Sequence, residues 1–90
     1  MGCYAVSYDL RKARNYDPLW NLLKTWGAVR LLESFWLLHT GASVAQIRDA
    51  LVAVVDGDDG IAVIEVKAPS LWATWNAVPL GVAWLKRFIP

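Results

Sequence analysis

The chain has too few cysteine and histidine residues for disulfides or a thiolate metal site. Cys3 is the sole cysteine among 90 residues and there is one histidine, so no intramolecular disulfide can form. No apolar run approaches the ~18 residues of a membrane helix, and the longest, 31–38, contains Glu33 and Ser34. The start also lacks the basic-then-apolar pattern of a signal peptide. We therefore expect a cytoplasmic protein with no membrane partner.

Charge is scarce as well. The formal net charge is +1, and charged residues make up 19% of the chain against 57% hydrophobic residues. These values exclude binding to nucleic acid through overall basicity and leave only local patches. The length allows a single domain over 1–90. Six tryptophans are more than one small core easily encloses, so an exposed apolar face and a second copy of the chain are expected.

The first strand is predicted by an alternation of bulky and small side chains over 3–10. One face carries the bulky residues Tyr4, Val6, Tyr8 and Leu10, and the other carries Cys3, Ala5, Ser7 and Asp9. The bulky face suits packing against helices, whereas the small face would let a second layer of backbone come close. Asp9 lies at the end of the small face.

Three helices are indicated by capping residues and apolar spacing. Asp17 as N-cap and Pro18 as first helical residue open a helix that Gly27 ends. Ser43 and Gln46 form a capping box for a second helix that runs to about residue 55. Pro79 opens a last helix over the final residues.

The remaining apolar segments predict strands. Residues 28–39 read as one long strand, bulged or covered on both faces, and 61–67 as a central strand covered on both faces. The segment 70–78 could form a short further strand. With right-handed crossovers, we expect an α+β, ferredoxin-like plait of the β-α-β-β-α-β type. Its four-stranded antiparallel sheet would carry two helices on one face, and its other face would pack sheet to sheet in a homodimer.

Several short stretches resemble the small dimeric endonucleases associated with CRISPR adaptation and their divergent bacterial relatives, among them virulence-associated ribonuclease toxins. These stretches are YAVSYDL at 4–10, WG at 26–27, VRLLESFW at 29–36 and DDGIAVIEV at 58–66. In that family, the aspartate that ends the first strand meets its copy across the dimer and is implicated in divalent-metal binding. Asp9 matches this position, with Tyr8 beside it, and Ser34 and Phe35 match the serine and phenylalanine of the second strand. Leu32, where the family often has glutamine, departs from the pattern.

Two interpretations of Asp9 stay open from the residues alone. Two copies across a twofold axis could hold Mg²⁺ or Mn²⁺ largely through water, because Mg²⁺ needs few protein ligands, and the ion could then promote phosphodiester hydrolysis. Alternatively, Asp9 caps a turn at the end of the strand. The acidic loop at 56–59 lacks the spacing of a calcium site, and Asp59 is expected to tie the turn before the next strand.

Cations follow Asp9 closely. Arg11, Lys12 and Arg14 could grip phosphates, with Arg30 adding to the patch, or they could form an ordinary solvated loop. The exposed tryptophans are expected to serve dimer packing rather than base stacking.

The resemblance implies a metal-dependent endoribonuclease or endodeoxyribonuclease acting as a homodimer on RNA or DNA, possible partners including another defence-system protein. Two other interpretations remain: a non-catalytic, dimeric nucleic-acid-binding or architectural protein, and a ribonuclease toxin of a toxin–antitoxin pair.

Overall fold

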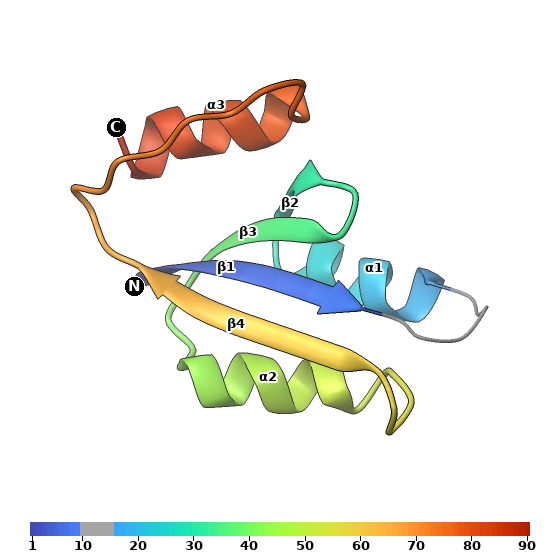
Figure 1. Ribbon diagram of the computed structural model, residues 1–90. Helices are drawn as coiled ribbons and strands as arrows, with labels where there is room; N and C mark the ends of the chain where they lie inside the picture. Colours follow the sequence, from blue (N-terminus) through green and yellow to red (C-terminus); the bar gives the residue numbers. More distant parts are fainter. Residues whose placement is uncertain (10–15) are drawn as a thin grey trace.

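The chain folds into a four-stranded antiparallel sheet and three helices. The computed structural model describes residues 1–9 and 16–90 (Figure 1). Its elements are β1 (Gly2–Asp9), α1 (Asp17–Thr25), β2 (Val29–Leu32), β3 (Phe35–Thr40), α2 (Val44–Val52), β4 (Gly60–Val66) and α3 (Pro79–Phe88). The strands lie in the order β2-β3-β1-β4, which is compatible with a ferredoxin-like fold. The predicted α+β class and the four-stranded antiparallel sheet are confirmed.

The alternation in β1 decides which side of the sheet the first two helices cover. Tyr4, Val6 and Tyr8 are buried, and they pack in one core with Trp36, Leu38 and the inward residues of the helices, which are Leu19, Leu23, Ile47 and Leu51. Figure 1 shows α1 and α2 on the same side of the sheet. The predicted pair of helices on one face is therefore confirmed.

The single long strand expected over 28–39 is a hairpin of two strands. β2 and β3 pair antiparallel, with Leu32 opposite Phe35 and a register shift between Arg30 and Leu32. The reversal occurs at Glu33 and Ser34, which lack the Asn-Gly or Asp-Gly signal of a two-residue hairpin turn. The hairpin supplies the fourth strand, and residues 70–78, read as a further strand, form none.

The expected central place of the strand over 61–67 is wrong, because β4 is an edge strand beside β1. Its near-continuous apolar sequence does not reflect burial on two faces, since Ile64 is 63% exposed. Ile64 lies opposite Ala5 of β1, so it points to the small face of the sheet, where no described helix covers it.

The last helix covers part of the face that was expected to stay open. α3 lies across the sheet from α1 and α2 (Figure 1), where Trp84, Leu85 and Ile89 pack with Leu31 and Leu37 in a second core. Its first turn docks on β2, since the Val78 N–H donates to the Leu31 carbonyl at 2.9 Å. A side chain at Gly81 would meet the Arg30 carbonyl oxygen at 2.6 Å, so this close approach requires glycine.

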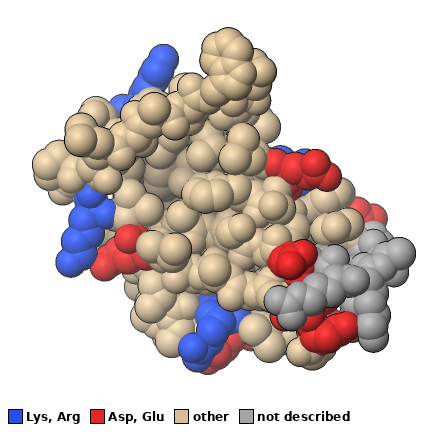
Figure 2. Space-filling model, viewed as in Figure 1, with Lys and Arg blue, Asp and Glu red and all other residues tan. Residues whose placement is uncertain are grey.

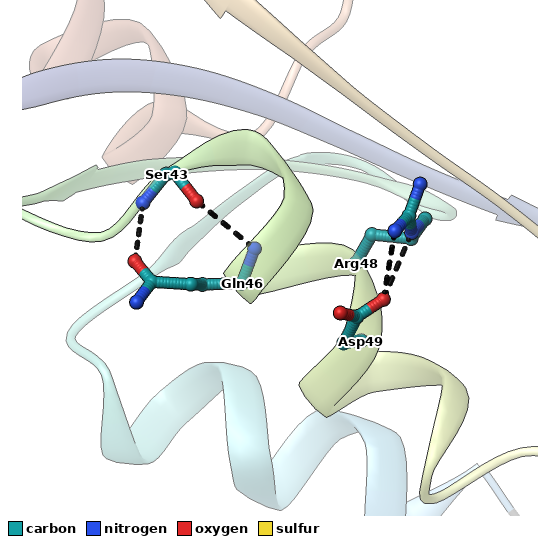
Figure 3. Close-up of polar contacts among 4 residues, drawn as sticks. All are labelled: Ser43, Gln46, Arg48 and Asp49. Atoms are coloured by element: carbon teal, nitrogen blue, oxygen red, sulfur yellow. Dashed lines mark hydrogen bonds and ion pairs between the residues drawn. The ribbon is translucent and has the colours of Figure 1, made fainter.

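Local capping follows the sequence closely. The Ser43 hydroxyl accepts from the Gln46 N–H at 3.1 Å and the Gln46 side chain accepts from the Ser43 N–H at 2.9 Å (Figure 3). This confirms the predicted capping box, although α2 ends at Val52 rather than near residue 55. Asp17 is the first residue of α1, not its N-cap, which is Tyr16. Among the described residues, no helix is both long and apolar enough to cross a membrane.

Candidate active-site cleft at the end of β1

A cleft of about 290 Å³ opens where β1 ends. Three elements meet there: the last residues of β1, the start of α1, and the turn that joins β2 to β3. The lining residues are Tyr8, Asp9, Tyr16, Trp20, Glu33 and Ser34. The cleft thus gathers three of the residues singled out from the sequence, Tyr8, Asp9 and Ser34.

Tyr8 fixes the wall of the cleft through its hydroxyl. The Tyr8 Oη accepts hydrogen bonds from the indole Nε1 of Trp20 at 2.7 Å and of Trp36 at 3.3 Å. The same hydroxyl donates to the Glu33 carbonyl at 3.1 Å, which holds the β2–β3 turn against β1. One side chain therefore ties together β1, α1 and the hairpin, and it is buried while doing so.

Asp9 stands at the exposed end of β1, opposite Gly60 of β4. By strand alternation, Asp9 shares the face of Ala5 and Ser7, which is the small face of the sheet. Asp9 is exposed, and it lines the cleft together with the two residues of the β2–β3 turn.

Glu33 is a second carboxylate residue in the same cleft, and it was not among the site residues expected from the sequence. Glu33 and Ser34 are both exposed in the hairpin turn, and both line the cleft with Asp9. The signal available was the interruption of the apolar run 31–38 by these two polar residues. Because the sequence did not predict the β2–β3 turn, these two residues could not be placed next to the end of β1.

The other residues singled out from the sequence do not join this cleft. Phe35 lies opposite Ser7, on the small face and away from Tyr8. Arg30 sits on β2 with its guanidinium carbon 4.6 Å from the ring centre of Trp20 and 4.8 Å from that of Trp36. Three expected phosphate-binding residues lie outside the described residues: Arg11, Lys12 and Arg14.

The cleft offers hard oxygen donors rather than a preformed ion cage. Across 1–9 and 16–90, no cluster of three or more His, Cys, Asp or Glu residues is positioned to hold an ion. Two carboxylates and a hydroxyl suit Mg²⁺ or Mn²⁺, which are bound by one or two carboxylates with water and substrate phosphate.

The acidic loop 56–59, which precedes β4, forms a hydrogen-bonded turn. The Asp59 carboxylate accepts from the Asp56 N–H at 2.9 Å, and the Asp59 N–H donates to the Asp56 carbonyl at 3.1 Å. This confirms that Asp59 ties the turn.

The small face carries an apolar groove of about 400 Å³ between the sheet and the segment that leads to α3. Leu71 and Trp75 on its rim are 101% and 86% exposed, and Leu32 is 47% exposed. Trp72 is held instead by a hydrogen bond from its indole to the Ile89 carbonyl at 2.6 Å. Figure 2 shows a broad uncharged area over α3 and its leading segment, with charged side chains toward the margins.

Comparison with known proteins identifies the fold without a function. No protein-family model matches the sequence. A solved structure, described as a hypothetical protein TT1823 from Thermus thermophilus, superposes with a TM-score of 0.68. The two chains are 22% identical, and the match covers 86% of this chain and 94% of the other. At this identity the likeness concerns the fold alone.

Proposed function

We propose that the protein is a metal-dependent endonuclease in which Asp9 is the principal ion ligand. The observation that carries the proposal is the shared cleft of Asp9, Glu33 and Ser34 at the end of the central strand. Residues with oxygen donors from two separate elements line it, and the sequence directly after Asp9 carries three cations. A divalent ion held by these oxygens would supply Lewis-acid stabilisation of charge on a phosphodiester.

The residues of the chain have distinct tasks in this proposal. Asp9 and Glu33 bind the ion, and Ser34 orients a phosphate oxygen by donating a hydrogen bond. Tyr8 positions Glu33 by holding the turn at its carbonyl. The sequence-adjacent cations Arg11, Lys12 and Arg14 would contact flanking phosphates and make binding sensitive to salt.

We further propose that the working unit is a homodimer formed through the small face of the sheet. Support comes from the exposed Ile64 on β4 and the exposed Leu71 and Trp75 beside the groove. α3 covers the β2–β3 part of this face, and its cluster also includes Cys3, Ala5 and Val66 at one end of β1 and β4. The other end of β1 and β4, around Ala62 and Ile64, is left for a second copy. Because Asp9 points to the same face, such a dimer would bring two Asp9 side chains toward each other.

The test is cleavage of labelled RNA and DNA with Mg²⁺, with Mn²⁺ and with a chelator. We expect cleavage only with an ion present, and a loss of at least about a hundredfold in rate for Asp9→Asn, which removes a charge in place. Asp49→Asn is the matched control, since Asp49 lies on α2 in an exposed pair with Arg48 at 2.9 Å (Figure 3). Equal cleavage by Asp9→Asn and the parent protein would remove the proposal.

A non-catalytic nucleic-acid-binding dimer is the second candidate. The observation in its favour is the guanidinium of Arg30, which contacts two indole rings at the edge of the sheet. If this candidate is right, the protein binds RNA or DNA in the presence of a chelator and cleaves neither of them.

A further inference from the structure

A second pocket lies on the other side of Trp20 from the Asp9 cleft. Its volume is about 480 Å³, and it is bounded by α1, the β2–β3 hairpin and the start of α3. The lining residues are Trp20, Lys24, Ala28, Val29, Arg30, Trp36, Val78 and Leu80. Two of these residues are cations, and none is acidic.

The guanidinium of Arg30 is fixed in place by aromatic rings. It lies 4.6 Å from the ring centre of Trp20 and 4.8 Å from that of Trp36. Both indoles are anchored through Nε1 to the Tyr8 hydroxyl, and Trp20 stacks on Tyr16 with ring centres 5.1 Å apart. A guanidinium packed on two anchored rings has less freedom to lose when an anion binds.

This held cation has no anionic partner in the part of the chain that the structure describes. The Arg30 Nε is fully buried and donates to no acceptor there, and no described carboxylate forms an ion pair with Arg30. Burying a guanidinium N–H unpaired is costly, and such groups are normally satisfied by a carboxylate or a phosphate. Cation–π contact offsets part of that cost but leaves the donors of the fork unused.

We propose that this pocket binds the phosphate group of a nucleotide. The Nε of Arg30 is closed to solvent, but its two terminal nitrogens are not among the buried unpartnered atoms, and their parallel N–H groups suit two phosphate oxygens. Lys24, exposed on α1, adds a second positive charge. A bare phosphate would leave the apolar walls empty. Val78 and Leu80, the latter 71% exposed, offer a surface for the sugar and base.

The inference goes beyond the proposed endonuclease, because this pocket needs neither a divalent ion nor a second copy of the chain. The phosphate could come from a free nucleotide or from a nucleic-acid strand. A nucleic-acid strand bound in this pocket could also extend to the Asp9 cleft, because Trp20 lines both the cleft and the pocket.

The test is a titration followed by ¹H–¹⁵N NMR in chelator, with adenosine monophosphate, inorganic phosphate and a short single-stranded oligonucleotide as separate ligands. We expect adenosine monophosphate to shift the signals of Arg30 Nε–H and of the Trp20 and Trp36 indole N–H groups. Inorganic phosphate should bind more weakly. If the oligonucleotide binds more tightly than adenosine monophosphate, the bound phosphate belongs to a nucleic-acid strand. If the two ligands bind with equal affinity, it belongs to a free nucleotide.

Variants distinguish binding in this pocket from nonspecific attraction to positive charge elsewhere on the protein. Arg30→Gln should weaken binding by about tenfold to a hundredfold. Lys24→Gln should weaken it by a few-fold with no effect on folding, because the side chain is exposed. Arg48→Gln and Lys67→Gln remove exposed cations elsewhere and should bind as the parent does. Unmoved Arg30 and Trp20 signals at about millimolar nucleotide, inorganic phosphate as tight as the nucleotide, or equal weakening by the control variants would overturn the inference.

Discussion

Tyr8 is the residue on which the geometry of both pockets depends. Its hydroxyl accepts from Trp20 and Trp36 and donates to the Glu33 carbonyl. The sequence predicted that Tyr8 lies on the face that packs against helices and that Asp9 ends the strand on the small face. It could not predict that two tryptophans, 12 and 28 residues further along the chain, share one hydroxyl, because such a contact depends on tertiary placement.

Replacing Tyr8 by Phe should destabilise the protein by about 1–3 kcal/mol, because two indole N–H donors lose a buried or part-buried acceptor. Urea unfolding gives the free energy directly. Tyr4→Phe is the matched control: Tyr4 is equally buried, and its hydroxyl makes no hydrogen bond within residues 1–9 and 16–90. If both variants unfolded at the same urea concentration, the network would have no net energetic role.

At the scale of elements, the helices were predicted well and the strands less well. Helix signals are local: Pro18, the Ser43–Gln46 box and Pro79 each lie at or near the start of a helix. The β2–β3 reversal has no such local signal, since Glu33 and Ser34 are ordinary residues at a turn. The edge position of β4 was misjudged because apolar residues on an uncovered face resemble those of a buried strand.

The docking of α3 on β2 depends on Gly81. A Cβ there would lie 2.6 Å from the Arg30 carbonyl oxygen and 2.7 Å from the Leu31 Cα, and neither backbone atom can move aside without shifting β2. We expect Gly81→Ala to lower the free energy of unfolding by about 1–3 kcal/mol, measured by urea unfolding. Gly57→Ala, where a Cβ meets nothing within 4 Å, should be near neutral. A neutral Gly81→Ala would show that α3 does not dock as described.

At the scale of the molecule, the question is what covers the small face of the sheet. The sequence predicted an uncovered face and surplus tryptophans. α3 buries Trp84 on that face, while Trp75 remains 86% exposed. The open part of this face is therefore reduced to the stretch of β1 and β4 around Ser7 and Ile64, and Asp9 follows on the same side of β1. The sequence could place the small residues of β1 on this face but could not show that the chain's own last helix would share it.

A charge on this surface should prevent association. We expect Ile64→Lys to convert a dimer to a monomer in sedimentation or light-scattering measurements, because a lysine would be buried without a partner at the interface. Val52→Lys, at a position 50% exposed on α2, should leave the dimer intact. If the parent protein is monomeric at all concentrations, the proposed dimer is wrong. The Asp9 cleft would be unaffected by that result, because one chain forms all of it.

A divalent ion bound at the end of β1 can be detected with Mn²⁺, because this paramagnetic ion broadens the NMR signals of nearby groups. In a ¹⁵N-labelled protein at low Mn²⁺, we predict that the amide signals of Tyr8, Glu33 and Ser34 broaden first and that Asp9→Asn abolishes this. Broadening that is confined to the acidic loop 56–59, or that is unchanged in Asp9→Asn, would show that Asp9 does not bind the ion.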